Sequence, residues 1–366
     1  MAQQSDFFKN IVKNMNDENV NILADGLNSS EFSNYVDTGS YALNALLSGT
    51  IYGGAADNKV VALAGEEATG KTFFTLAMVK QWMEDNPTGY VFYFDTESAV
   101  TKKMMSSRGI DPARIIIVEP VTIQEMKHKA LTILNKYIEA KAKDRPPMAY
   151  VLDSLGQLST TKEVEDSESG AETKDMTRTA QIKAAFRVLR LKLAKAKVPW
   201  FITNHVYTMV GSYGNPKEMS GGSGLKYAAD QILFLTKSKD RDGDTKPGAV
   251  VHGNFIKVTA KKSRLTKENS FVKVKLSYAT GLDRYYGLLD IALKGGVVMK
   301  EGKKNKFPNG EMAFENAIYN NPEKWFTKEV LDLIDVAAGK IFLYGEGEGS
   351  DVDDLIEELE DEYEAA

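Results

Sequence analysis

The sequence contains no cysteine and only three histidines, His128, His205 and His252. Without cysteine the protein can form neither disulfide bonds nor metal sites held by thiolates. With so few histidines we do not expect a metal site built mainly from imidazole ligands. A protein without cysteine fits a reducing compartment, and we expect it to act in the cytoplasm.

Long apolar segments are also missing. No run of about 18 apolar residues occurs, so we expect no membrane-spanning helix. Residues 1–10, MAQQSDFFKN, lack the basic and apolar regions of a signal peptide. Apolar residues nevertheless make up 43% of the 366 residues, which suffices for one large domain and a smaller one.

Basic residues are missing from one end of the chain. Residues 341–366 hold 11 acidic side chains and no lysine or arginine. Without this segment the formal net charge of −5 becomes +6, from 46 basic and 40 acidic residues. A mildly basic body with an acidic tail suggests a protein that binds a polyanion and carries its own competitor. The charge pattern alone favours the simpler alternative, a disordered tail that keeps the protein soluble.

The central part of the chain alternates short apolar runs with longer helical segments. The apolar runs lie at residues 59–65, 90–95, 114–118, 148–153, 199–203 and 231–235. Because polar residues do not alternate within these runs, they predict strands buried on both faces of a mostly parallel sheet. Residues 255–260 and 271–277 do alternate, which indicates an exposed edge or a hairpin. The sequence therefore predicts an α/β core, followed by a small α+β domain over residues 284–345.

Residues 65–72, GEEATGKT, match the phosphate-binding pattern G-x-x-x-x-G-K-[ST]. The motif follows an apolar strand and precedes TFFTLAMVKQWM, which is typical of a helix, and this is the context that the motif requires. Backbone N–H groups and the helix N-terminus surround the phosphates in such a loop. Lys71 would reach the β- and γ-phosphates and Thr72 would bind Mg²⁺. We therefore predict a site for ATP and Mg²⁺; the alternative is a plain glycine turn. The predicted nucleotide-binding residues of this segment are Gly65, Glu66, Glu67, Ala68, Thr69, Gly70, Lys71, Thr72 and Phe73.

Two carboxylates follow other predicted strands. Asp153 ends the run MAYVLD, where a P-loop enzyme needs a carboxylate near its metal; the alternative is a residue that only caps the strand. Glu97, in FDTES, comes just after another strand. Because the carboxyl ends of parallel strands line the ligand crevice, Glu97 is the candidate for the group that orients water.

These segments resemble the RecA family of strand-exchange recombinases, and most of all its phage branch of the UvsX type. The resemblance rests on DTGSYALNALLSG, GEEATGKT, YFDTES, SRGIDPARI, VLDSLGQL, DMTRTAQIKAAFRVL, ITNH and MSGGSGLKYAAD, followed by KKSRLTKE and GLDRYYGLLDIAL. It covers residues 35–292, most of the chain, and implies a RecA-like P-loop ATPase core. If a phage encodes the chain, the expected compartment is the cytoplasm of the host.

The resemblance implies catalytic roles for several residues. Asp153 would support Mg²⁺ from outside its direct ligands, Glu97 would activate the attacking water, and His205 in TNH would sense the γ-phosphate. Lys262 and Arg264 in KKSR would reach the γ-phosphate of the neighbouring protomer and stabilise its charge as an arginine finger does. His205 could instead be a buried hydrogen-bonded histidine, and the two cations could lie on a solvated edge strand.

One position departs from the family. The family stacks an aromatic ring on adenine seven residues after the catalytic glutamate, and this chain has Met104 there. A methionine can cover the face of a base but orients it more weakly than a ring does. This departure bears on selectivity for adenine and leaves the prediction of hydrolysis unchanged.

Two segments are expected to bind DNA. The first, residues 159–175, is acidic, so we expect less of the contact there. The second, residues 206–222, contains four glycines and suits a loop that orders around its ligand. Its apolar side chains would stack on bases while backbone amides and Arg178 meet phosphates; the alternative is a flexible surface loop. The predicted DNA-binding residues are Arg178, Val206, Met209, Val210, Tyr213, Gly221 and Gly222.

The resemblance thus implies an ATP-dependent recombination protein that forms filaments on single-stranded DNA and promotes its pairing and strand exchange with a homologous duplex. It would act in recombination, repair and recombination-dependent replication, with a single-strand-binding protein and a loader as partners. Two alternatives stay open, a ring helicase built on the same core and a recombination mediator that binds ATP without hydrolysing it.

The predicted domain organisation has four parts. These are a polymerisation segment at 1–35, the ATPase and DNA-binding core at 36–283, the small domain at 284–345 and the acidic tail at 346–366. The first part carries an apolar helical stripe, which would pack on the next protomer or, alternatively, on the core of its own chain. The stripe consists of Phe7, Phe8, Ile11, Val12 and Met15.

Overall fold

The structure is a computed structural model. It describes residues 6–15, 17, 20, 22–23, 32, 34–170, 176–208, 217–221, 223–238, 253–277 and 280–345. Several parts of the predicted sites lie outside these residues, namely Met209, Val210, Tyr213, Gly222 and the acidic tail 346–366.

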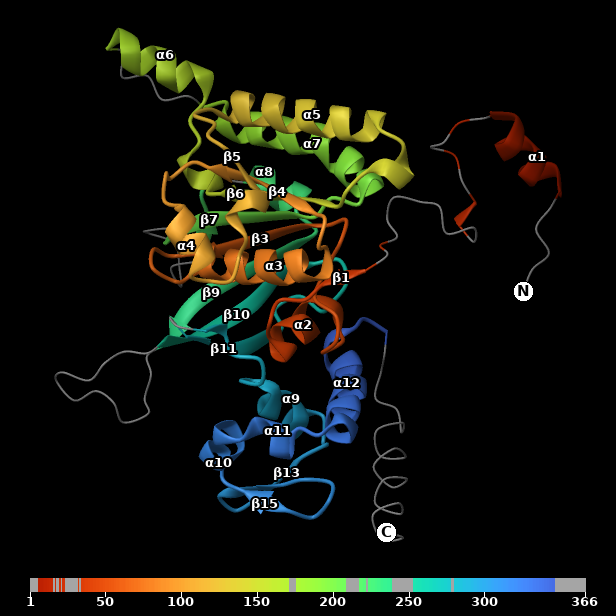
Figure 1. Ribbon diagram of the computed structural model, residues 1–366, viewed down its shortest axis with the longest axis vertical. Coiled ribbons are helices and arrows are strands. Elements are labelled where there is room, and N and C mark those ends of the chain that lie inside the picture. Colours follow the sequence, from red (N-terminus) through yellow and green to blue (C-terminus); the bar gives the residue numbers. More distant parts are fainter. Residues whose placement is uncertain are drawn as a thin grey trace.

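A large sheet forms the centre of the described chain (Figure 1). Its strands in spatial order are β12 (Gly281–Leu282), β11 (Phe271–Ser277), β10 (Gly253–Ser263), β9 (Gln231–Ser238), β3 (Val60–Gly65), β7 (Trp200–Thr208), β6 (Met148–Asp153), β4 (Tyr90–Asp95) and β5 (Ile115–Val118), with β8 (Lys217–Met219) paired to β7. The strands from β9 to β5 run parallel, whereas β10, β11 and β12 are antiparallel to their neighbours. Both the mostly parallel sheet and the hairpin predicted from the alternating residues are thus confirmed.

Burial on both faces explains why the apolar runs do not alternate. In β3, Val61 and Leu63 belong to the core on one face, and Val60, Ala62 and Ala64 belong to the core on the other. Strands covered by helices on both sides need apolar residues at every position. The sequence pattern therefore follows directly from the layered architecture.

Helices cover the two faces of the sheet. The face with Val61 packs against α2 (Tyr41–Ser48) and α3 (Lys71–Asp85). The opposite face packs against α5 (Ile123–Glu139), α7 (Arg178–Ala196) and α8 (Ser223–Ala228); α5 and α7 lie side by side above the sheet in Figure 1. Shorter elements complete this part: β1 (Tyr35–Val36), β2 (Ala55–Ala56), α4 (Lys102–Ser106), the 3-10 turns η2 (Pro112–Arg114), η3 (Ala142–Asp144) and η4 (Leu155–Gln157), and α6 (Thr161–Ser169).

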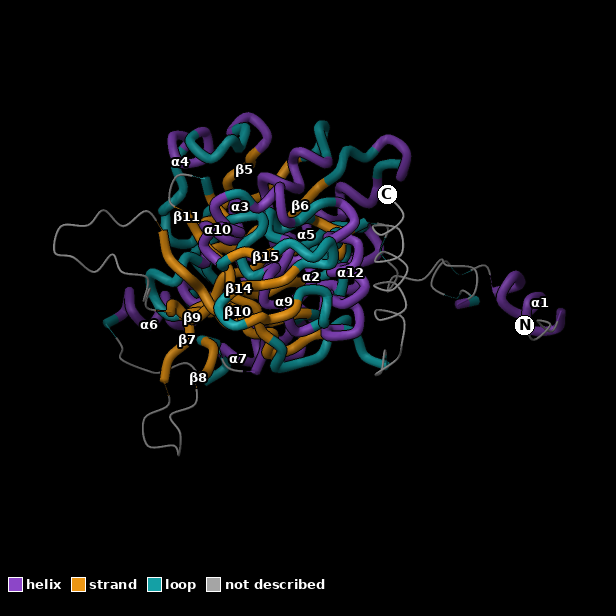
Figure 2. Tube along the Cα trace, turned by 90° about the horizontal axis from the view of Figure 1, so that it is seen from below, coloured by secondary structure: helices purple, strands orange, loops and turns teal. Residues whose placement is uncertain are grey.

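The C-terminal elements form the predicted α+β appendage. They are α9 (Leu288–Lys294), β13 (Met299–Glu301), β14 (Lys304–Lys306), β15 (Met312–Ala313), α10 (Glu315–Asn320), α11 (Pro322–Trp325) and α12 (Lys328–Phe342). They lie at the end of the sheet away from α5 and α7, and they overlie the strands when seen from below (Figures 1 and 2). Asp335 accepts hydrogen bonds from the Thr50 hydroxyl at 2.6 Å and the Ile51 amide at 2.7 Å. The appendage therefore shares a core with the α2 side, and its boundary at residue 284 stays a prediction.

Helix α1 (Asp6–Met15) lies apart from the rest of the described chain in both views (Figures 1 and 2). Its residues Phe7, Phe8, Ile11 and Met15 are exposed. The predicted apolar stripe therefore forms on one helix and is not covered by the described part of its own core. Among the described residues, no helix is long and apolar enough to cross a membrane.

Candidate active site

The P-loop joins the end of β3 to the start of α3. Gly65 ends the strand, Lys71 begins the helix, and Gly70 between them has a φ of 88°, which favours glycine. A Cβ atom on Gly65 would lie 2.4 Å from the Thr69 hydroxyl oxygen, so only glycine fits there. The two glycines of the motif therefore allow a tight loop that leads directly into the N-terminus of α3.

The side chain of Lys71 lies inside this loop. Its ammonium group donates hydrogen bonds to the carbonyl oxygens of Gly65 at 3.2 Å and Glu66 at 2.9 Å. Burial lowers the pKa of Lys71, an effect that the nearby carboxylates of Glu97 and Asp153 oppose. The lysine is thus a partly desolvated cation at the position where phosphate would supply its counter-charge.

The carboxylate of Asp153 accepts hydrogen bonds from hydroxyl groups on three neighbouring elements. Its Oδ2 atom accepts hydrogen bonds from the Thr72 hydroxyl and the Tyr93 hydroxyl, each at 2.8 Å, and its Oδ1 atom accepts one from the Thr203 hydroxyl. The carboxylate is buried. Asp153 therefore fixes the hydroxyl of Thr72, which is the predicted Mg²⁺ ligand.

Glu97 is held by two groups. The Ser154 hydroxyl donates to Oε1 of Glu97 at 2.7 Å, and Nε2 of His205 lies 3.2 Å from the same oxygen. Burial raises the pKa of Glu97, but the hydrogen bonds from Ser154 and His205 and the charge of Lys71 outweigh it, so this pKa lies below its ordinary value. Glu97 is therefore an oriented carboxylate that stays ionised at neutral pH.

The strand register explains why these residues meet. Asp95 at the end of β4 pairs with Asp153 at the end of β6, and Gly65 pairs with His205 on β7. Carboxyl ends of parallel strands lie at one edge of the sheet, so residues far apart in sequence converge there. The residues predicted from three separate motifs thus form one cluster.

A cavity of about 390 Å³ lies beside this cluster. Its walls include the P-loop from Glu67 to Phe73, together with Glu97, Asp153 and His205. Met104, whose contact with a base stays a prediction, also lines it. Ile256 on β10 and Leu276 on β11 add an apolar wall that the sequence analysis did not identify.

The site offers few protein ligands for a metal. Among the described residues, no three His, Asp or Glu side chains gather into a metal-binding group. A hydroxyl such as that of Thr72, backed by a carboxylate, suits Mg²⁺, which keeps several waters and shares the phosphates of its nucleotide. The residues present therefore fit Mg²⁺ carried with a nucleotide better than a permanently bound metal.

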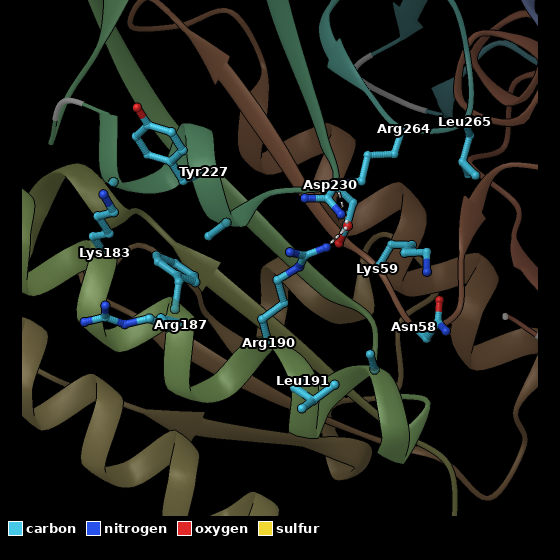
Figure 3. A pocket seen from close by; sticks show the side chains of 14 residues that line it. Asn58, Lys59, Lys183, Arg187, Arg190, Leu191, Tyr227, Asp230, Arg264 and Leu265 are labelled. Carbon is cyan, nitrogen blue, oxygen red and sulfur yellow. Dashed lines mark hydrogen bonds and ion pairs between the residues drawn. The ribbon is translucent and has the colours of Figure 1, made fainter. Parts of the chain in front are cut away.

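The two predicted cations at the end of β10, Lys262 within the strand and Arg264 just after it (the β10 cations), lie at the opposite ends of the parallel strands from this cluster. Lys262 donates to the carbonyl oxygens of Lys226 and Ala229, the latter at 2.7 Å, and so ties β10 to α8. Arg264 is more exposed, and its Nε lies 3.5 Å from Oδ1 of Asp230 (Figure 3). The two residues, equivalent in the sequence analysis, therefore differ in how available they are to another molecule: Lys262 is bound to backbone carbonyls, whereas Arg264 is more exposed.

The predicted DNA-binding residues that the structure describes have internal contacts. Arg178 begins α7 and donates to the carbonyl oxygens of Gly156 at 2.8 Å and Leu158 at 3.0 Å. Gly221 has a φ of 78°, and a Cβ atom there would lie 2.6 Å from Ile182. Val206 pairs with Met219 between β7 and β8. These residues therefore support the segments around the predicted loops.

Sequence reasoning missed Tyr93, Ser154 and Thr203, which hold the two carboxylates. Two signals were present. Ser154 directly follows Asp153, and Thr203 lies two residues before His205, so both strand ends carry a second polar side chain. Their partners depend on strand order, which the sequence pattern alone does not give.

Comparison with known proteins points to one family. A family model described as the RecA N-terminal domain matches residues 4–283. The chain is 30% identical over 277 residues to the "Recombination and repair protein" of Enterobacteria phage T4, covering 75% of this chain and 68% of that protein. It is 26% identical over 317 residues to Protein RecA of Malacoplasma penetrans, covering 84% and 90%. Protein RecA of Cereibacter sphaeroides is 26% identical over 332 residues, covering 87% and 89%. The family match spans the P-loop, both carboxylates and the β10 cations.

Proposed function

The chain belongs to the RecA family, and we propose that it is an ATP-dependent recombinase that acts in DNA recombination and repair. It would assemble on single-stranded DNA and promote pairing and strand exchange with a homologous duplex. The observation that carries this proposal is the convergence of Lys71, Asp153 and Glu97 on one cavity. Measuring ATP hydrolysis with and without single-stranded DNA tests it, and a DNA-stimulated ATPase is the expected result.

Each residue of the cluster has a chemical task in ATP hydrolysis. Lys71 neutralises phosphate charge, and Thr72, held by Asp153, would bind Mg²⁺. When bound, Mg²⁺ neutralises charge on the phosphate oxygens. Glu97 orients the attacking water and accepts its proton, because its low pKa keeps it ionised. His205 contacts the same carboxylate from β7, the strand that leads into the second predicted DNA loop, which makes it the candidate link between nucleotide and DNA.

The position of Arg264 supports a site shared between protomers. Ser263 pairs with Gln231 at the start of β9, whereas the P-loop glycine Gly65 pairs with Leu235 farther along that strand. At about 3.3 Å per residue, this separation amounts to about 13 Å along the strand. Arg264 lies one residue beyond Ser263, away from its own P-loop, so a nucleotide that it contacts would be one held by another protomer.

Mixing two inactive variants should restore activity. Lys262→Ala with Arg264→Ala should lower the DNA-dependent ATPase rate by about 1000-fold or more, as loss of an arginine finger does. Adding Lys71→Ala protein should restore part of the rate, because some interfaces then combine an intact P-loop with intact cations. The measurement is ATP turnover at a fixed total protein concentration across mixing ratios.

Two further variants sharpen this experiment. Lys261→Ala removes an exposed cation from the same strand and should behave like the parent. Arg264→Ala alone should account for most of the loss, because Lys262 is bound to α8. If mixed filaments form and no rescue appears at any ratio, the shared site is wrong.

Two exposed apolar features support self-association. Helix α1 exposes its stripe, including Phe7 and Phe8. Strand β5 lies at the edge of the sheet and exposes Ile116 and Ile117. An uncapped edge strand with exposed apolar residues is open to another chain. Packing of α1 on a neighbouring protomer is therefore our proposal, in preference to packing on its own core.

Cations near the predicted loops support DNA binding. Lys183 and Arg187 lie exposed on α7, and the Lys183 ammonium is 4.6 Å from the ring centre of the exposed Tyr227. Exposed cations beside an aromatic ring suit phosphates and unpaired bases. The loop residues Met209, Val210, Tyr213 and Gly222 stay predictions, as do the loader, the single-strand-binding protein and the cytoplasmic location.

The acidic tail is expected to weaken duplex binding. The hairpin of β13 and β14 carries Lys300, Lys303, Lys304 and Lys306, and the tail would compete with duplex DNA for this cluster or for the DNA-binding groove itself. Truncation after Ser350 should therefore strengthen duplex DNA binding, most clearly at low salt, because exposed charges are screened within about 8 Å at physiological ionic strength. The truncated protein should keep a negative salt slope of its own.

A salt series with both proteins decides between the two roles of the tail. Duplex affinity is measured for the full-length and the truncated chain at each salt concentration. Superimposable curves would contradict competition and leave a role in solubility or in docking another protein.

Two alternative functions are separated by direct observation. Electron microscopy with ATP and single-stranded DNA distinguishes helical filaments from the closed rings of a helicase. The ATPase assay distinguishes an enzyme from a mediator that does not hydrolyse ATP. The ordered carboxylate Glu97 favours the enzyme.

A further inference from the structure

A groove of about 570 Å³ lies between α7, α8 and the start of β3. Figure 3 shows its lining, with five cationic side chains, Lys59, Lys183, Arg187, Arg190 and Arg264. Among the described lining residues, Asp230 is the sole carboxylate. The groove therefore concentrates positive charge around one negative group.

The carboxylate of Asp230 is buried and contacts groups from three segments of the chain. Its Oδ2 atom accepts a hydrogen bond from the amide of Val60 at 3.1 Å, which ties it to the first residue of β3. Its Oδ1 atom accepts one from Nη2 of Arg190 at 2.8 Å and lies 3.5 Å from Nε of Arg264. A carboxylate hydrogen-bonded to the start of β3 thus contacts two arginines from different parts of the chain, Arg190 in α7 and Arg264 just after β10 (Figure 3).

The two arginines differ in exposure. Arg190 is 34% exposed, whereas Arg264 is 47% exposed and meets Asp230 through Nε. An arginine engaged at Nε can still present its terminal amino groups to a phosphate, because the guanidinium carries donors on more than one edge. Asp230 can therefore orient Arg264 without occupying the atoms that would bind the neighbour.

We propose that Asp230 is the positioning residue for Arg264, holding its guanidinium at the rim of the groove so that it meets the nucleotide of the neighbouring protomer. The proposal rests on the shared ATP site proposed above. A free arginine samples many rotamers, and each is lost when it binds phosphate. An ion pair that restricts the Arg264 side chain beforehand removes part of that loss, and the negative charge offsets repulsion from the other cations of the groove.

The same contacts also allow two other roles for Asp230, competition with phosphate and a purely structural role. If Asp230 competes with the neighbour's phosphate for Arg264, removing its charge would raise the ATPase rate. If Asp230 only secures β3 and Arg190, its removal would act independently of Arg264. Both possibilities give results that differ from those of the positioning role.

The main test is Asp230→Asn. The amide oxygen can still accept from Val60, while the charge that holds Arg264 is lost. The DNA-dependent kcat should fall by about tenfold or more, as for other groups that orient a functional side chain. The KM for ATP should change little, because the protomer's own P-loop is intact. Unchanged or raised kcat would overturn the proposal.

A double-mutant cycle excludes a merely structural role. In an Arg264→Ala background, Asp230→Asn should cause little further loss, since the group that it positions is gone. Arg190→Gln, which removes the other arginine, should leave kcat close to the parent value. A loss of equal size in both backgrounds, or the same loss in Arg190→Gln, would overturn the proposal.

Mixed filaments locate the defect on the correct side of the interface. Asp230→Asn should be rescued by Lys71→Ala protein, which supplies intact Arg264 to an intact P-loop. It should not be rescued by Arg264→Ala protein, because no interface then holds a positioned arginine. Rescue by Arg264→Ala protein would overturn the proposal.

One variant keeps the test open even if Asp230→Asn does not fold. Arg264→Lys retains a positive charge at the rim, but a single ammonium cannot pair with Asp230 and bind the neighbour's phosphate through separate edges as a guanidinium can, so it should also lose kcat. Full activity of Arg264→Lys would overturn the positioning role. The shared site itself fails separately, if Arg264→Ala is fully active or is not rescued by Lys71→Ala.

Discussion

Lys71→Ala is expected to abolish DNA-dependent ATP hydrolysis and strand exchange. Lys71 is the cation enclosed by the P-loop, and its ammonium already lies against two carbonyl oxygens of that loop. Removing a preorganised charge from a phosphate site costs about 100-fold or more in rate. The measurement is the steady-state ATPase rate with saturating single-stranded DNA, alongside a strand-exchange assay.

The fold should survive this substitution. Alanine is the best helix former, and Lys71 is the first residue of α3. Burial disfavours the charged form of Lys71, as its lowered pKa indicates. Loss of the ammonium therefore removes a desolvation cost from the free energy of folding. Thermal unfolding without nucleotide checks this point.

Lys80→Ala is the matched control. Lys80 lies on the same helix, is half-buried and pairs with Glu84 at 3.7 Å, a contact of little energetic consequence. It should keep the parent ATPase rate. Near-normal turnover by Lys71→Ala would remove the P-loop assignment.

The architecture was largely predictable because its signals are local. Strands buried on both faces produce continuous apolar runs, and the alternating segments 255–260 and 271–277 became the hairpin of β10 and β11. The P-loop is equally local, since its pattern, strand and helix occupy adjacent residues. Such features need no knowledge of which strands are neighbours.

The contacts within the site were not predictable to the same degree. Tyr93 reaches Asp153 because β4 lies beside β6, and Thr203 reaches it because β7 lies on the other side. The register of parallel strands decides these pairs, and the sequence pattern leaves strand order open. For the same reason, the sequence did not predict that Ile256 and Leu276 line the cavity beside the P-loop.

The cations of the KKSR segment show a second limit on what the sequence alone can predict. Lys262 and Arg264 were treated alike, because spacing in an isolated strand cannot tell which partner each side chain meets. The β-bulge between Ala260 and Lys262 changes the register of β10 against β9. A bulge re-aims the side chains that follow it. Lys262 thus contacts α8, whereas Arg264 lies at Asp230.

Glu97→Gln is expected to separate ATP binding from hydrolysis. Glutamine keeps the shape of the side chain, and its amide oxygen can still accept from the Ser154 hydroxyl, which lies 2.7 Å from the present carboxylate oxygen. It cannot accept a proton from water at neutral pH. Loss of a general base costs about 100- to 10,000-fold in rate.

The kinetic pattern is as informative as the size of the loss. The kcat should fall while ATP binding and filament formation on single-stranded DNA persist, because the P-loop and the β10 cations are untouched. In the parent protein, protonation of Glu97 should reduce activity only at pH values below 4.5, the ordinary pKa of a glutamate, because the pKa of Glu97 is lowered. Activity should therefore hold as pH falls toward that value and decline only as the carboxylate becomes protonated.

Glu84→Gln provides the control for charge and shape. Glu84 lies exposed on α3 and pairs with Lys80, so its substitution makes the same chemical change away from the site. Single-turnover hydrolysis by preformed filaments is the decisive measurement, since it isolates the chemical step from binding and product release. Hydrolysis by Glu97→Gln at the rate of Glu84→Gln would show that another group activates the water. Ser154→Ala should then be tested beside it, because a smaller loss there is expected only if the orientation of Glu97 limits the chemical step.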